Sequence, residues 1–156
     1  MSDNTITRRT LLGTAASAAA FTILPGRVFG RGRTKPPSEK LNIAGIGVGG
    51  MGSVNMNNLA TENIVALCDV DPEYAAKCIT KFPDARVWTD YREMLEKQND
   101  IDAVMIATPD HTHAVIAMAA LKAGKHVYLQ KPLTHDIYEA RALAKAARES
   151  KVITQM

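Results

Sequence analysis

The sequence lacks a close cysteine pair, a long apolar segment and a large excess of one charge sign. Its two cysteines, Cys68 and Cys78, do not have the close spacing that metal and redox motifs require. We interpret both as small core residues. No run of about 18 apolar residues is present, so no membrane-spanning helix is predicted.

The length of 156 residues allows one domain of ordinary size and a leader. With 46% hydrophobic and 22% charged residues, the composition is that of a globular protein that can bury a core. Much of the net charge of +3 comes from residues 1–30, where Arg8, Arg9 and Arg27 are balanced only by Asp3. The remaining 16 basic and 15 acidic residues nearly cancel, which argues against nucleic acid or an anionic membrane as the main partner.

Residues 1–30 resemble an export signal that is not part of the fold. The segment 7–12 reads TRRTLL, is followed by small and apolar residues, and is similar to a twin-arginine signal. Such a signal implies the twin-arginine export machinery as a partner and a periplasmic or secreted protein. We expect cleavage after Gly30 or an uncleaved membrane anchor, and a frayed helical arm is the alternative. Residues 31–40, rich in Arg, Gly, Pro and Lys, are predicted to be a linker.

The most informative stretch covers residues 41–53, which read LNIAGIGVGGMGS. An apolar run typical of a buried parallel strand leads into Gly47, Gly49 and Gly52, which form the pattern G-x-G-x-x-G. The first glycine permits a sharp turn, the second a close approach of a pyrophosphate, and the third close packing of the next helix. Because the N–H groups that begin this helix can bind phosphate, we assign cofactor binding to the whole turn: Gly47, Val48, Gly49, Gly50, Met51 and Gly52.

Asp69 ends a second apolar run, residues 64–68, about 20 residues beyond the glycines. A carboxylate at this position can accept both hydroxyl groups of an adenosine ribose. Asp69 is followed by Val70 and Asp71, with no arginine nearby in the sequence to meet a 2′-phosphate. The order of strand, glycine turn, helix, strand and acid therefore predicts a dinucleotide site that favours NAD over NADP.

Apolar strands and helical segments alternate over the rest of the chain. The sequence predicts strands over residues 41–46, 64–68, 86–88, 101–107, 127–129 and 152–154. It predicts helices over residues 52–60, 73–82, 91–97, 111–123 and 136–150. This alternation predicts an α/β fold with a doubly wound parallel sheet, in which ligands bind at the carboxyl ends of the strands.

Two further polar segments directly follow predicted strands. Residues 108–113 read TPDHTH after the fourth strand, and residues 130–132 read QKP after the fifth. Because the carboxyl ends of parallel strands lie at one edge of a sheet, both segments belong to the predicted ligand site. The H-x-H spacing of the first segment has no third ligand nearby, so we predict no metal site.

The glycine turn, Asp69 and these two segments together resemble the Gfo/Idh/MocA oxidoreductases, the group of glucose-fructose oxidoreductase and inositol dehydrogenase. ATPDHTH is similar to the family's ATP-(N/D)-x-x-H loop, and HVYLQKPL is similar to its H-V-x-x-E-K-P segment. The resemblance covers residues 41–156, and it implies an NAD(P)-binding Rossmann domain.

The resemblance also implies roles for residues that match the family's motifs. Thr108, Pro109 and His113 match the loop beside the nicotinamide half of the cofactor. Lys131 matches the lysine that faces both the nicotinamide ribose and the substrate. We expect Lys131 to be catalytic, because its charge would orient a substrate hydroxyl or assist proton transfer. Pro132 would set the loop that aims Lys131.

Gln130 departs from the family pattern, which more commonly has Glu at this place. Its amide can hydrogen-bond a ribose or a carboxamide but carries no charge, and it looks like the variant of exported family members. We therefore include Gln130, with Lys131 and Pro132, in the predicted cofactor site.

In this family an α+β substrate domain normally follows the Rossmann domain, and this sequence ends before it. We therefore expect a truncated chain that binds a dinucleotide better than it catalyses, and a homo-oligomer if full length. The leading interpretation is an NAD-dependent oxidoreductase that transfers a hydride between nicotinamide and a sugar or cyclitol hydroxyl. Two alternatives stay open: an NAD-dependent glycosidase of the same superfamily, and a cofactor-binding fragment without catalysis.

Overall fold

The structure is a computed structural model that describes residues 39–156. The predicted twin-arginine segment, residues 1–30, lies outside the described residues, as does the predicted linker up to residue 38. Within residues 39–156, no helix has the length and apolar character needed to cross a membrane.

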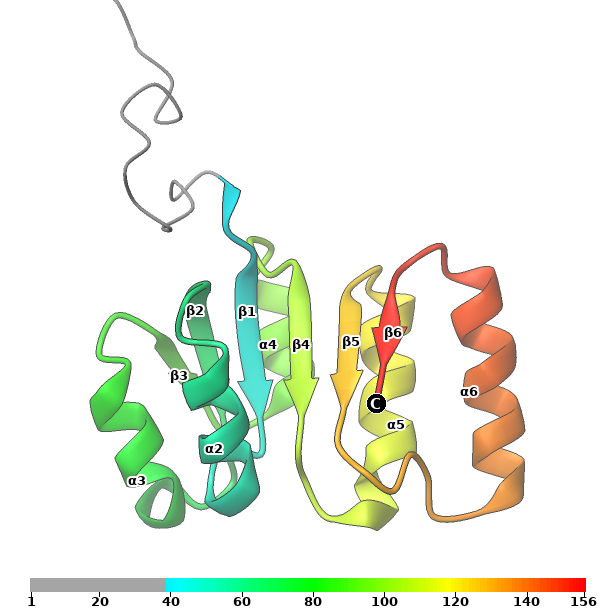
Figure 1. Cartoon of the computed structure of the whole chain (residues 1–156), viewed down its shortest axis with the longest axis horizontal. Helices are drawn as coiled ribbons and strands as arrows, with labels where there is room; N and C mark the ends of the chain where they lie inside the picture. The colour runs from blue at the N-terminus through cyan, green and yellow to red at the C-terminus, as the bar shows by residue number, and fades with distance from the viewer. Residues whose placement is uncertain (1–38) are drawn as a thin grey trace, which may run out of the picture. The chain divides into compact units, whose positions relative to one another are not determined.

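Strands and helices alternate along the described chain, as the sequence predicts (Figure 1). The strands are β1 (Asn42–Ile46), β2 (Asn63–Cys68), β3 (Arg86–Trp88), β4 (Ala103–Ile106), β5 (His126–Leu129) and β6 (Thr154–Gln155). The helices are α2 (Gly50–Asn58), α3 (Pro72–Lys81), α4 (Tyr91–Lys97), α5 (Asp110–Lys122) and α6 (Ile137–Glu149). The predicted α/β fold is confirmed.

The strands form one parallel sheet in the order β3-β2-β1-β4-β5-β6. β1 lies near the centre, where Ile46 is opposite Cys68 of β2 on one side and Ile106 of β4 on the other. The chain runs outward from β1 to β3 and then restarts at β4 on the other side of β1. This reversal creates a switch point between the carboxyl ends of β1 and β4, where doubly wound sheets bind ligands.

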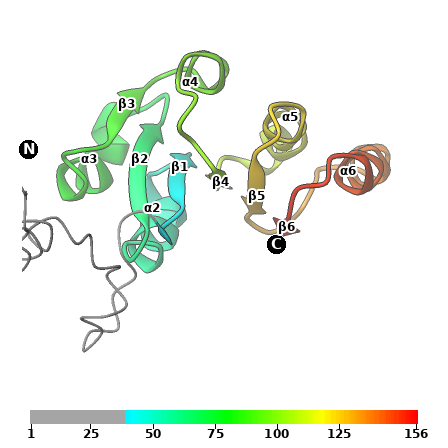
Figure 2. The ribbon, with the colours of Figure 1, turned by 90° about the horizontal axis from the view of Figure 1, so that it is seen from above.

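Side chains of β1 alternate between two hydrophobic cores, because successive residues of a strand point to opposite faces. Ala44 and Ile46 belong to a core shared with α4, α5 and α6. Ile43 belongs to a second core shared with α2 and α3. Figure 2 shows α4, α5 and α6 on one face of the sheet and α2 and α3 on the other. Burial on both faces explains why the central strands are continuous apolar runs.

Aspartates begin three of the described helices. Asp71, Asp90 and Asp136 occupy the N-cap positions of α3, α4 and α6, and each side chain accepts a hydrogen bond from a backbone N–H of the first turn. Pro72 follows Asp71 at the first position of α3, where a missing N–H has no consequence. These local signals explain why the sequence predicts the helix starts after β2, β3 and β5.

The last strand begins later than the sequence predicts. α6 extends to Glu149 with Ser150 as its C-cap, and Lys151 then adopts a left-handed conformation with φ of 56°. This turn leads the chain from α6 to the edge strand β6 (Figure 1). Pairing with β5 starts when the N–H of Val127 donates to the carbonyl oxygen of Ile153, so β6 begins at Thr154 instead of Val152.

Both cysteines are buried, as predicted, Cys68 in β2 and Cys78 in α3. Burial raises the pKa of the Cys68 thiol to about 12, and the carboxylates of Asp69 and Asp90 act in the same direction. Burial also raises the pKa of the Cys78 thiol. Because the thiolate is the nucleophile, the folded chain should protect both thiols from alkylation.

We therefore predict that iodoacetamide at neutral pH leaves Cys68 and Cys78 unmodified in the folded chain and modifies both in concentrated urea. Peptide mass spectrometry at matched reaction times measures the modified fraction of each residue. Equal modification of Cys68 in the two conditions would contradict the burial described above.

Candidate functional site

A cavity of about 690 Å³ opens at the carboxyl edge of the sheet, among the loops that follow β1, β2, β3 and β4. Its volume lies in the range of small-molecule sites in proteins. Five residues that the sequence analysis assigned to the site line this cavity: Gly47, Gly49, Asp69, Thr108 and Pro109. The parallel sheet thus brings together three segments that are far apart in the sequence.

The glycine turn places backbone N–H groups at this edge. Gly47 follows β1 with φ of 75°, and its N–H donates to the carbonyl oxygen of Cys68 at 2.8 Å. A Cβ at Gly52 would overlap the carbonyl oxygen of Gly47, so only glycine lets α2 begin this close to β1. Gly49 is the N-cap of α2 and provides no side-chain cap. The first-turn N–H groups of α2 are therefore available to an anion.

The Asp69 side chain connects this turn to the end of β2 by hydrogen bonds. One carboxylate oxygen, Oδ2, accepts hydrogen bonds from the N–H groups of Val48 at 2.8 Å and Gly49 at 3.1 Å. The other, Oδ1, accepts from the N–H of Asp71 at 3.0 Å. A carboxylate offers about four acceptor positions, so in this arrangement one remains for a ribose hydroxyl. Binding both hydroxyls, as the sequence analysis expected, would require Asp69 to release a backbone N–H.

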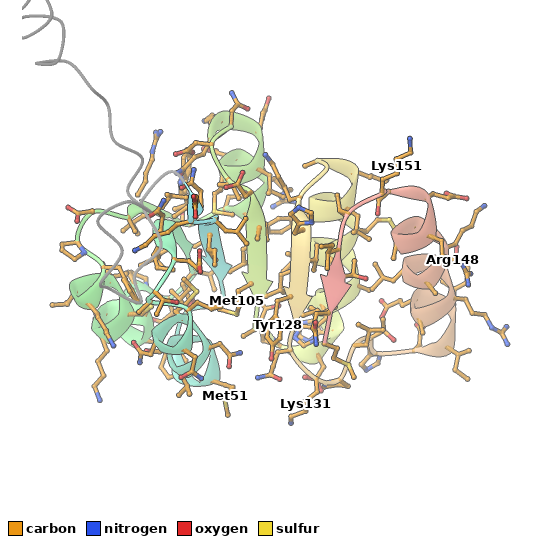
Figure 3. The ribbon with its side chains drawn as sticks, turned by 45° about the horizontal axis from the view of Figure 1, so that its top comes forward. Met51, Met105, Tyr128, Lys131, Arg148 and Lys151 are labelled. Carbon is orange, nitrogen blue, oxygen red and sulfur yellow. The ribbon has the colours of Figure 1, made fainter. Side chains whose placement is uncertain are left out.

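Val48 and Met51 contribute main-chain groups to the turn, and their side chains lie elsewhere. The Val48 side chain is fully buried in the core beneath α2 and α3. The Met51 side chain is exposed, and Figure 3 shows it at the carboxyl edge of the sheet. The chemistry of this segment is therefore that of its backbone.

Tyr74 lines the same cavity, although the sequence analysis did not assign it. Its ring lies against the glycine turn so closely that a Cβ at Gly49 or Gly50 would overlap it. Gly50 also has φ of 45°, which L side chains rarely adopt. The signal that could have indicated Tyr74 is its place in the first turn of α3, next to the loop that contains Asp69.

Arg92 is a second residue that sequence reasoning missed. It lines the cavity together with Asp69, so an arginine is present although none is close in the sequence. Its guanidinium is paired with Asp90 at 3.0 Å and lies 5.5 Å from the ring centroid of Tyr91. The ion pair is exposed, with 73% of the Arg92 side chain accessible, so solvent screens it. The signal for Arg92 was its position just after β3, at the same edge.

The loop after β4 brings Thr108 and Pro109 to the cavity and then begins α5. The Thr112 hydroxyl lies 2.7 Å from the Pro109 carbonyl oxygen and 2.8 Å from the Thr108 hydroxyl oxygen, which braces this loop. His113 does not line the cavity. Its ring is only 1% exposed and lies between the carbonyl oxygens of Thr108 and Pro132, 2.7 Å from each.

The loop after β5 contains Gln130, Lys131 and Pro132. The N–H of Gln130 donates to the carbonyl oxygen of Ile106, which continues the pairing of β5 with β4 by one residue. The Gln130 side chain then accepts from the N–H of Lys131 at 2.9 Å. Lys131 is exposed, and Figure 3 shows its side chain projecting from the carboxyl edge of the sheet, where Met51 also lies. These three residues do not line the cavity itself.

This strand order, with a glycine turn after β1 and an acid at the end of β2, defines a dinucleotide-binding α/β domain. The close approach of Gly52 to Gly47 and the uncapped start of α2 fit a pyrophosphate. No group of three His, Cys, Asp or Glu side chains within residues 39–156 is placed to hold a metal ion. Residues 41–156 match the model of the GFO_IDH_MocA family, described as an oxidoreductase family with an NAD-binding Rossmann fold. The chain belongs to this family.

Curated relatives of the chain are dehydrogenases. Levoglucosan dehydrogenase of Pseudarthrobacter phenanthrenivorans is 36% identical over 87 residues, which are 56% of this chain and 22% of the relative. Inositol 2-dehydrogenase of Acidothermus cellulolyticus is 37% identical over 99 residues, which are 61% of this chain and 29% of the relative. The chain therefore spans less than a third of the length of these two proteins.

Solved structures agree with this assignment. Scyllo-inositol dehydrogenase from Lactobacillus casei, solved with NAD(H) and scyllo-inositol, superposes with a TM-score of 0.69 at 26% identity, covering 75% of this chain and 36% of that one. GenD2 from gentamicin A biosynthesis, solved with NAD, gives a TM-score of 0.71 at 33% identity, covering 80% of this chain and 36% of that one. The fold of residues 39–156 is thus that of the NAD-binding part of such enzymes.

The contact between Gly52 and Gly47 yields a test with a matched control. We predict that Gly52→Ala destabilises the chain by about 3 kcal/mol, because the added methyl forces α2 away from β1. It should also abolish NAD binding. Gly124→Ala should cost about 1–2 kcal/mol for its positive φ alone, since a Cβ there meets nothing within 4 Å, and NAD binding should persist. Urea unfolding and calorimetric titration measure both effects, and equal NAD affinity of the two variants would contradict the packing argument.

Proposed function

We propose that this chain is the NAD-binding part of an oxidoreductase that transfers a hydride between nicotinamide and a hydroxyl group of a sugar or cyclitol. The observation that carries this proposal is the glycine turn, fastened by Asp69 beside a cavity of about 690 Å³. The names of the relatives, levoglucosan dehydrogenase and inositol 2-dehydrogenase, support the substrate class.

The pyrophosphate and the adenosine ribose of NAD would be held by different kinds of group. The first-turn N–H groups of α2 would bind the pyrophosphate, helped by the positive end of the helix dipole. Asp69 would accept a hydroxyl of the adenosine ribose. Asp71 adds a second negative charge beside Asp69, which disfavours the 2′-phosphate of NADP. Arg92 lies near enough to line the cavity, but its charge is already paired with Asp90.

Bound NAD supplies the group that accepts or donates the hydride. We assign the loops 108–113 and 130–132 to the nicotinamide half, because both follow strands at the edge that bears the glycine turn. The exposed ammonium of Lys131 would orient a substrate hydroxyl and stabilise negative charge that develops on its oxygen. We further propose that the full-length protein is a homo-oligomer, which native mass spectrometry would test by counting subunits and bound NAD together.

The role of Asp69 is tested by removing its charge. We predict that the chain binds NAD at least about tenfold more tightly than NADP, and that Asp69→Asn weakens NAD binding about tenfold or more. The reason is that a hydrogen bond to a charged group contributes about 1.5–3 kcal/mol. Asp84→Asn is the control, because Asp84 is exposed and lies before β3, at the opposite edge of the sheet. Isothermal titration measures the affinities, and a folded wild-type chain that does not bind NAD would refute the proposal.

We also propose that the protein is exported through the twin-arginine pathway to the periplasm or beyond. Support comes from the segment TRRTLL at residues 7–12 and the small and apolar residues that follow it. This pathway carries folded proteins, which suits a domain that takes up NAD in the cytosol.

Export should depend on the two arginines themselves rather than on their charge. We predict that a double change, Arg8→Lys with Arg9→Lys, retains the full chain in the cytosol, whereas Arg27→Lys is exported like the wild type. Cell fractionation followed by immunoblotting measures the exported share. If the double variant is exported as well as the wild type, the twin-arginine assignment is wrong.

A further inference from the structure

His113 is the buried polar side chain of the described residues, and both of its ring nitrogens face acceptors. Nδ1 lies 2.7 Å from the carbonyl oxygen of Pro132, and Nε2 lies 2.7 Å from that of Thr108. A carbonyl oxygen cannot donate a hydrogen bond, so each contact is a hydrogen bond only if the ring nitrogen carries a hydrogen. A neutral imidazole carries one such hydrogen, whereas an imidazolium carries two.

The ring is planar and 1% exposed, and each of its nitrogens lies within hydrogen-bond distance of one carbonyl oxygen. Whichever nitrogen carries a hydrogen donates it to the carbonyl that it faces, so the ring spans the space between the two carbonyls.

The two acceptors belong to different loops, and this gives the contact its significance. Thr108 lies in the loop between β4 and α5, and this loop lines the cavity. Pro132 directly follows Lys131 in the loop after β5. The last sheet hydrogen bond between these segments joins Gln130 to Ile106. Beyond that point, in the described part of the chain, the polar contacts that join the two loops are those of the His113 ring.

We propose that His113 is a positioning residue that clamps the Lys131 loop to the cavity-lining Thr108 loop and so fixes where Lys131 stands relative to a bound nucleotide. The inference rests on the proposed function, because it concerns the same site. His113 touches neither the cavity nor a reacting group, and it acts through the two carbonyls that it holds.

The ring of the wild-type chain tests the proposal without any variant. We expect a ring N–H of His113 that exchanges slowly with solvent, because the ring is 1% exposed and both nitrogens face carbonyl oxygens, and rapid exchange at the exposed His135. Long-range ¹H–¹⁵N correlation spectra of the ¹⁵N-labelled protein measure both. Rapid exchange at the His113 ring would overturn the inference, whatever any variant does.

A variant then tests the clamp. His113→Gln ends in a single amide group, whose NH₂ can reach only one of the two carbonyls that the ring spans. We expect NAD to bind about tenfold more weakly, AMP to bind unchanged, and amide hydrogen exchange at residues 131–134 to accelerate. AMP is the discriminating probe because it occupies only the adenosine side of the site. His135→Gln is the matched control and should change none of the three.

The outcomes separate the two proposals. A wild-type chain that binds neither AMP nor NAD refutes the proposed function. Normal NAD binding and unchanged exchange in His113→Gln refute the clamp and leave the function standing. Equal weakening of AMP and NAD would show that His113 only supports the fold, which also overturns the inference. If His113→Gln does not fold, judged by circular dichroism, the ring spectrum of the wild type decides.

Discussion

The bond between the Asp69 carboxylate and the N–H groups of Val48 and Gly49 is the contact on which the rest of this site depends. It joins the carboxyl end of β2 to the turn after β1, and residues at the ends of both strands line the cavity. Because the acceptor is charged, the bond is stronger than one between neutral groups. It holds the turn open before any ligand arrives, so less ordering remains when a ligand binds.

Much of the fold is determined by local patterns in the sequence. The spacing of Gly47, Gly49 and Gly52, the apolar runs, and capping aspartates such as Asp90 each act over a few residues, so they are legible without the tertiary structure. The start of β6 was not predicted, because it depends on a left-handed turn at Lys151, for which the side chain gives no signal. The doubly wound parallel sheet was predicted from the alternation of strands and helices, and the structure confirms it.

The sequence predicted which segments meet at the cavity, but not the contacts that their residues make there. Sequence spacing placed Asp69 and Thr108 at the correct edge, yet it could not show that Asp69 already binds backbone N–H groups. Tyr74 and Arg92 reach the cavity from the first turns of α3 and α4, which carry no binding motif, so only the packing of the sheet reveals them. His113 was placed in the loop by its motif, and its burial between two carbonyls depends on a loop 19 residues away.

Val48 illustrates the consequence of building a site from main-chain groups. Its N–H serves the turn while its side chain is sealed in the core beneath α2 and α3. Natural selection acting on side chains can therefore move this donor but cannot change its chemical nature. The main-chain donors of this turn are in this sense inherited with the fold, whereas residues such as Val70 and Arg92, whose side chains line the cavity, remain open to change. New cofactor or substrate preferences in this lineage should therefore arise from changes in the side chains that line the cavity, while the main-chain donors of the turn stay the same.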